Sequence, residues 1–103
     1  MTTFGVYYSK TMDQGRLFDV PTHWKREEYY FLGPYEANNK DHLFGILNGA
    51  HGRNPLSASR LQEIISREKL HTSMSVGDVL IDSTSGKAYM CAMVGWTEVV
   101  EVI

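Results

Sequence analysis

The chain has 103 residues, a formal net charge of −2, and 43% hydrophobic and 12% aromatic residues. This length suits one domain spanning residues 1–103, because a second core would have too few apolar residues. The apolar content excludes a wholly disordered chain. The lack of excess Lys and Arg argues against a protein that coats nucleic acid through many phosphate contacts.

The cysteine content and the amino terminus indicate the cellular setting. Cys91 is the one cysteine of the sequence, so an intrachain disulfide and a cysteine-based zinc site are excluded. Cys91 lies in an apolar run and is expected to be buried rather than reactive. The first residues lack the features of a secretory signal, and no stretch is long enough to span a membrane. We therefore expect a cytoplasmic protein that does not associate with membranes.

The first half of the chain predicts two strands separated by a loop. Residues 2–9 are rich in β-branched and aromatic residues and predict the first strand. Residues 10–25 are polar and irregular, which predicts an ordered loop with Trp24 as one of its apolar anchors. Residues 27–37 predict the second strand, and Gly33-Pro34 within it predicts a bulge or a sheet edge.

Two short helices are predicted in the middle of the chain. Residues 40–49 follow the helix-capping pair Asn38-Asn39, and Gly49 is placed to end the helix in a left-handed conformation. The next segment opens with Ser59-Arg60-Leu61-Gln62, which matches a Ser-x-x-Gln capping box. Apolar residues then recur at helical spacing, so this segment predicts the second helix.

After His71 the hydrophobic period changes to two. Residues 79–82 and 87–94 flank the turn 83–86 and predict a β-hairpin, and residues 96–102 predict a last strand after Gly95. The predicted fold is therefore α+β. We expect a mostly antiparallel sheet of four or five strands, with a C-terminal three-stranded meander and two short helices on one face.

The last third of the chain carries a recognisable pattern of residues: Ser73-Met74-Ser75-Val76-Gly77-Asp78-Val79, then Tyr89, then Gly95-Trp96 with Val99. It resembles the C-terminal signature of YodL-like domains and related small uncharacterised proteins of bacterial phages, plasmids and conjugative elements. The resemblance implies a small α+β accessory protein in the bacterial cytoplasm and implies no activity. Ala92-Met93 departs from the polar pair that relatives often have before the Gly-aromatic step.

Two interpretations of this motif remain open. Gly77-Asp78 can open a strand, with the carboxylate accepting backbone N–H groups at the turn, which is a structural role. The polar segment His71-Thr72-Ser73-Met74-Ser75 lies between a helix end and a strand start, where short exposed connections often bind ligands. The candidate binding residues are His71, Thr72, Ser73, Ser75, Asp78, Trp24, Arg53 and Trp96.

No catalytic or metal motif is recognised. The four histidines lack the spacing of a helical metal site, so we expect neither a metal nor a cofactor. A small metal-free nuclease would need His51, Arg53 and His71 to converge. A nucleotide or nucleic-acid binding module would need Lys25, Arg26, Arg53 and Trp24 on one face.

The composition of the last strands favours a protein partner. Apolar residues occur on both sides of these strands and include Met90, Met93 and Trp96. Such surfaces suit a partner or a second copy of the chain. The leading hypothesis is a non-catalytic accessory protein that engages or inhibits a host or defence protein, with a homodimer as a possible form.

Overall fold

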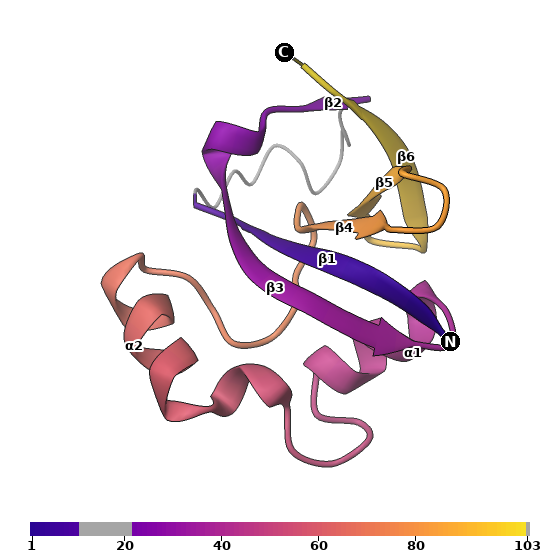
Figure 1. Ribbon diagram of the computed structural model, residues 1–103. Coiled ribbons are helices and arrows are strands. Elements are labelled where there is room, and N and C mark those ends of the chain that lie inside the picture. The colour runs from indigo at the N-terminus through magenta and orange to yellow at the C-terminus, as the bar shows by residue number, and fades with distance from the viewer. Residues whose placement is uncertain (11–21, 103) are drawn as a thin grey trace.

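The computed structural model describes residues 1–10 and 22–102, which form one sheet with helices on one side (Figure 1). The strands are β1 (Thr2–Ser9), β2 (His23–Trp24), β3 (Tyr29–Ala37), β4 (Val79–Asp82), β5 (Ala88–Cys91) and β6 (Trp96–Glu101). The α-helices are α1 (Lys40–Leu47) and α2 (Ser59–Arg67), and the short 3-10 helices are η2 (Arg26–Glu28) and η3 (Pro55–Ser57). The strand order is β2-β6-β5-β4-β1-β3.

The predicted α+β class and the C-terminal meander of β4, β5 and β6 are confirmed. The predicted four- or five-stranded sheet is wrong in detail, because the described sheet has six strands and is mixed. The strand that was missed is β2, which runs parallel to β6. It is two residues long and therefore shows no periodicity. Residues 11–21, which make up most of the predicted loop, lie outside the described residues.

The bulge predicted at Gly33-Pro34 is confirmed, and β3 lies at an edge of the sheet. Val6 of β1 is opposite Gly33, whereas Tyr7 is opposite Phe31, so Leu32 is the additional residue of β3. Gly33 has a φ of +109°, a conformation that residues with a side chain rarely adopt. A proline and a bulge both hinder the pairing of a further strand with this edge.

The sheet is strongly curled because its two edge strands are neighbours in sequence. Only η2 and Lys25 separate the end of β2 from the start of β3, although these strands lie at opposite edges. The Trp24 ring lies 5.3 Å from the Tyr7 ring and 5.4 Å from the Tyr29 ring, measured between centroids. The sheet therefore forms a partly closed barrel with an inner and an outer face.

Each face of the curled sheet has its own hydrophobic core. The inner core contains Tyr7, Trp24, Tyr29, Val79, Ala88, Met90 and Val99. The outer core lies between the sheet and the helices, and it includes Val6 and Tyr8 from β1, Leu43 and Leu47 from α1, and Ile65 from α2. The helices therefore cover one face, as predicted. Met90 was expected to face a partner, but it is fully buried inside the barrel.

The helix ends differ in how well the sequence predicts them. Asn39 caps α1, because its side chain accepts a hydrogen bond of 2.8 Å from the His42 backbone N–H. The capping box predicted for α2 is wrong: the N-cap residue is Ala58, which makes no side-chain cap. Gln62 instead turns its amide to the Leu56 carbonyl at 2.7 Å.

Candidate functional site

The polar segment 71–75 is held in place by long-range hydrogen bonds. The Thr72 carbonyl accepts from the buried Tyr8 hydroxyl at 3.0 Å and from the Asn54 amide at 3.2 Å. The Thr72 hydroxyl lies 2.9 Å from the Gln62 amide nitrogen. These bonds tie the segment to β1, η3 and α2, so Thr72 has a structural role.

Asp78 organises the start of the hairpin. Its side chain is 1% exposed, and its two carboxylate oxygens accept the backbone N–H groups of Ser9 and Ser75, each at 2.8 Å. The structural interpretation of the Gly-Asp pair is therefore confirmed. Burial, together with the nearby Asp78 charge, raises the pKa of the Tyr8 phenol far above its usual value. Tyr8 is therefore a neutral hydrogen-bond donor at all physiological pH values.

The other predicted binding residues are dispersed. Trp24 is 2% exposed and packs inside the barrel, so it cannot form the rim of a surface site. Arg53 is exposed and donates to the Ser57 hydroxyl at 2.9 Å. Trp96 lies beside α1, and Ser73 is exposed. No hydrogen bond or ring contact within residues 1–10 and 22–102 joins Trp24, Arg53 and Trp96 to one another.

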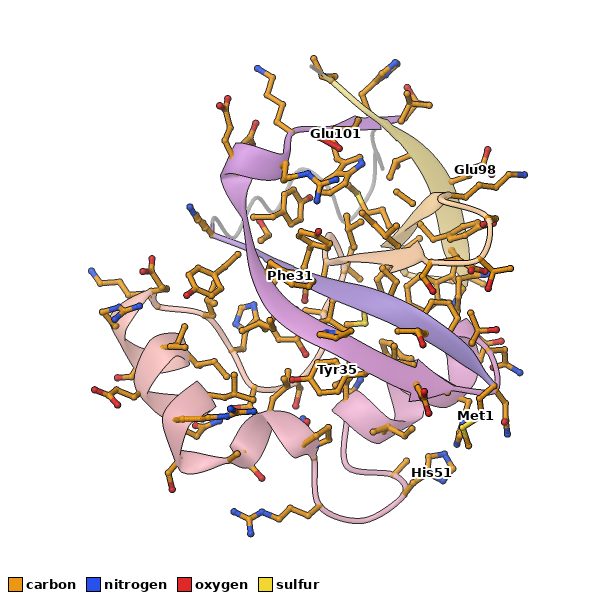
Figure 2. All side chains as sticks on the ribbon, in the orientation of Figure 1. Met1, Phe31, Tyr35, His51, Glu98 and Glu101 are labelled. Atoms are coloured by element: carbon orange, nitrogen blue, oxygen red, sulfur yellow. The ribbon has the colours of Figure 1, made fainter. Side chains whose placement is uncertain are left out.

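The residues required by the nuclease hypothesis make separate contacts. His51 packs its ring against that of His42, with 5.1 Å between the centroids (Figure 2 labels His51). In the described part of the chain, no hydrogen bond or ion pair links His51, Arg53 and His71. No three His, Cys, Asp or Glu side chains of the described residues are grouped so that they could hold a metal.

The basic and aromatic residues that the nucleic-acid hypothesis requires do not form a usable binding surface. Arg26 lies over the Trp24 ring at 5.2 Å, but it forms an ion pair with Glu101 in which Nη2 and Oε1 are 2.7 Å apart. The hydrogen bonds from the Arg26 guanidinium to the Glu101 carboxylate lower the pKa of Glu101 and raise the pKa of Arg26. The Arg26 charge is therefore already paired with the Glu101 carboxylate, and Trp24 is too deeply buried to stack on a base.

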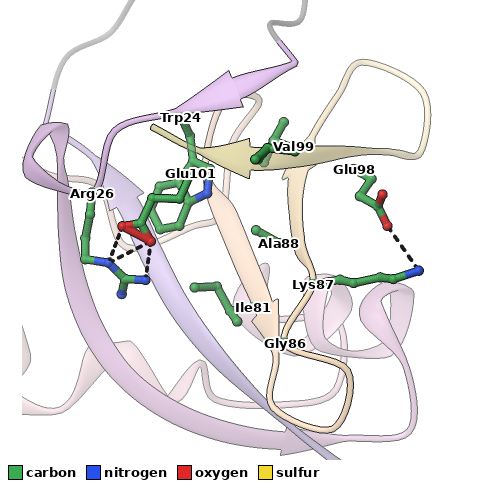
Figure 3. A pocket seen from close by; sticks show the side chains of 10 residues that line it. Trp24, Arg26, Ile81, Gly86, Lys87, Ala88, Glu98, Val99 and Glu101 are labelled. Atoms are coloured by element: carbon green, nitrogen blue, oxygen red, sulfur yellow. Dashed lines mark hydrogen bonds and ion pairs between the residues drawn. The ribbon is translucent and has the colours of Figure 1, made fainter. Parts of the chain in front are cut away.

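A cleft of about 320 Å³ opens at the mouth of the barrel (Figure 3). Its floor is apolar and includes Ile81, Ala88 and Val99. The Arg26–Glu101 pair lies at one end, and Lys87 and Glu98 form a second pair at 3.5 Å (Figure 3). Each charged group at this cleft already has a partner of opposite charge, so the cleft offers little to attract a charged ligand.

The turn between β5 and β6 presents apolar side chains to solvent. Its backbone closes with a hydrogen bond of 3.1 Å from Ala92 N–H to the Gly95 carbonyl. Met93 is 63% exposed and Val94 is 93% exposed. The Trp96 ring lies next to the Phe44 ring of α1, with 6.3 Å between centroids and an angle of 86°. We call Phe44, Met93, Val94 and Trp96 the tip patch.

A small groove of about 170 Å³ runs through the tip patch. It is lined by Asp41, Phe44, Met93, Gly95 and Trp96, together with Cys91 and Ala92. The Trp96 indole N–H donates to the Asp41 carboxylate at 2.9 Å, which fixes both side chains. Gly95 has a φ of +72°, and a side chain there would meet no neighbouring atom, so this end of the groove is open.

The thiol beside this groove is not a reactive group. Cys91 is 4% exposed, and burial, assisted by the charge of Asp78, raises its pKa to about 11. The thiolate is the nucleophilic form, so almost none of it is present at neutral pH. The expected burial of Cys91 is confirmed. The groove therefore offers aromatic, apolar and carboxylate surface for binding.

Comparison of the chain with family models, curated proteins and solved structures found no significant match. The resemblance to YodL-like domains therefore depends only on the residues that carry it. No helix among the described residues has the length and apolar character needed to cross a membrane.

Proposed function

We propose that this chain is a non-catalytic binding protein whose tip patch engages a partner protein. The observation that carries the proposal is the 93% exposure of Val94, next to the 63% exposed Met93, in a tight turn. Turns at this position favour Gly, Asn, Asp or Ser, which suit both the backbone and the solvent. Such exposed Val and Met side chains bury little apolar surface within the domain, whereas a partner that covers them would gain stability from their burial.

The surroundings of the turn support the same proposal. Trp96 and Phe44 line one groove with Met93, and aromatic residues and methionine are enriched in protein interfaces. The two rings are already held by packing and by the Trp96–Asp41 hydrogen bond. A partner would therefore lose little side-chain freedom on the domain side of the interface.

The biological setting of the proposal comes from the resemblance to YodL-like domains. We propose that the protein works in the bacterial cytoplasm in support of a phage or mobile element, and that the partner is a host or defence protein. A second copy of the chain would present the same patch and is the competing occupant.

Photo-crosslinking at the two hairpin tips tests this function. Benzoylphenylalanine replaces either Val94 in the β5–β6 turn or Ser85 in the β4–β5 turn, and bacterial cells that produce the tagged chain are irradiated. Both positions are exposed, but the Ser85 turn is polar. We expect one discrete adduct from position 94 and none from position 85.

The mass of the adduct identifies the occupant. An adduct of twice the chain mass means a homodimer, and any other discrete mass means a different partner. The same adducts from both positions would contradict binding through the tip patch.

A further inference from the structure

The groove in the tip patch combines two aromatic rings with one carboxylate. The rings of Phe44 and Trp96 stand at 86° to each other and form a corner, and the Asp41 carboxylate lies at this corner through its bond to the Trp96 indole. We call these three residues the cation corner. Its groove of about 170 Å³ is smaller than the roughly 300–1,000 Å³ of typical small-molecule sites, so it suits the end of one side chain.

Among residues 1–10 and 22–102, no cation pairs with the Asp41 carboxylate. Trp96 occupies Oδ1 of Asp41, and no Lys or Arg among the described residues forms an ion pair with Asp41. The adjacent Lys40 turns to another element, where its ammonium lies 4.1 Å from the centre of the Tyr89 ring. The corner therefore places an exposed negative charge beside two aromatic rings, an arrangement that can bind a cation from another molecule.

We propose that the cation corner receives an arginine side chain of the partner protein. This inference rests on the proposed function, since it names the chemistry of the partner's contact at the same patch. A planar guanidinium stacks on an aromatic ring while its edge donates to a carboxylate, and it is less strongly hydrated than an ammonium. The exposed thioether of Met93 can adapt to the methylene groups of the arginine stem.

The proposal is tested by titrating the ¹⁵N-labelled protein with N-acetyl-arginine amide and recording the indole N–H signals by NMR. Trp96 reports on the corner, and Trp24, buried inside the barrel, is an internal control. We expect a saturable shift of the Trp96 signal and a constant Trp24 signal. N-acetyl-lysine amide should bind more weakly, and neutral N-acetyl-glutamine amide should give no saturable shift.

Two isosteric variants separate the corner from general electrostatics. Asp41→Asn retains an oxygen acceptor for the Trp96 indole but removes the charge, and we expect it to weaken arginine amide binding roughly fivefold. Glu63→Gln removes one charge from an exposed position on α2 and should bind like the wild type. Equal binding by Asp41→Asn and the wild type, or equal shifts with the glutamine amide, would overturn the proposal.

The outcomes also distinguish this inference from the proposed function. If a partner crosslinks at Val94 but arginine amide leaves the Trp96 signal unmoved, the cation corner is wrong and the protein-binding function stands. If arginine amide binds at the corner but no adduct forms at Val94, the site stands without the proposed function.

Discussion

Replacing Asp78 with asparagine is expected to lower the free energy of unfolding by roughly 2–4 kcal/mol. Both carboxylate oxygens accept backbone N–H groups, from Ser9 and Ser75. Asparagine keeps one of these acceptors but turns an NH₂ group toward the other N–H donor. The side chain is 1% exposed, so water cannot replace the lost bond. Urea unfolding followed by circular dichroism measures the change.

Asp82→Asn is the matched control for this substitution. Asp82, the last residue of β4, accepts the Thr84 backbone N–H at 2.8 Å with one oxygen, Oδ1, at the start of the β4–β5 turn. Asparagine can make the same bond, so we expect a change of less than about 0.5 kcal/mol. Similar small changes at both positions would show that Asp78 does not organise the hairpin as described.

Replacing Trp24 with alanine is expected to cost roughly 3–5 kcal/mol of stability. The indole contacts Tyr7 and Tyr29 and lies between the two edges of the curled sheet. Removing it leaves a cavity in the inner core and also removes the ring beneath Arg26. Because the domain is small, Trp24→Phe provides a milder variant if the alanine variant does not fold.

Trp96→Ala is the comparison, because it removes the same side chain from the tip patch. Trp96 is half-buried against α1, so we expect a loss of about 1–2 kcal/mol. Chemical unfolding of the two alanine variants gives both values. A larger loss at Trp96 than at Trp24 would contradict the placement of Trp24 inside the barrel.

Local structure was predictable where a period or a cap is present in the sequence. The alternation over residues 79–82 predicts β4, and the bulge of β3 follows from Gly33-Pro34. The structural role of Asp78 also follows, because a carboxylate after a glycine at a strand start favours local N–H groups. Its second partner, Ser9, is 69 residues away and leaves no local signal.

The curled shape of the sheet was not predictable, because it depends on the strand order and on which two strands lie at its edges. Apolar residues on both sides of the last strands led to the expectation that one side faces a partner. The sheet instead curls and encloses Met90, so most of this apolar surface is internal. Trp24 was counted among the candidate binding residues, since nothing local in the sequence shows that β2 closes the barrel.

The tip patch was only partly visible in the sequence. Met93 and Trp96 were singled out, but the apolar run through Val94 was interpreted as strand, whereas β5 ends at Cys91. Gly95 was the available signal, because a glycine after two apolar residues marks a turn as readily as a bend between strands. Phe44, which was not singled out, is 37% exposed and packs against the Trp96 ring.

The central claim is that the β5–β6 turn is a protein-binding surface. Its most direct test is a double variant, Met93→Asp with Val94→Asp, whose affinity for the partner identified by crosslinking is compared with that of the wild type. We expect binding to weaken roughly 100-fold, with unchanged unfolding, because two exposed apolar side chains are replaced by charges. The control combines Val100→Asp and Val102→Asp, which are 60% and 43% exposed in the wild type and lie outside the tip patch. Wild-type affinity in the tip variant, or an equal loss in the control, would contradict the claim.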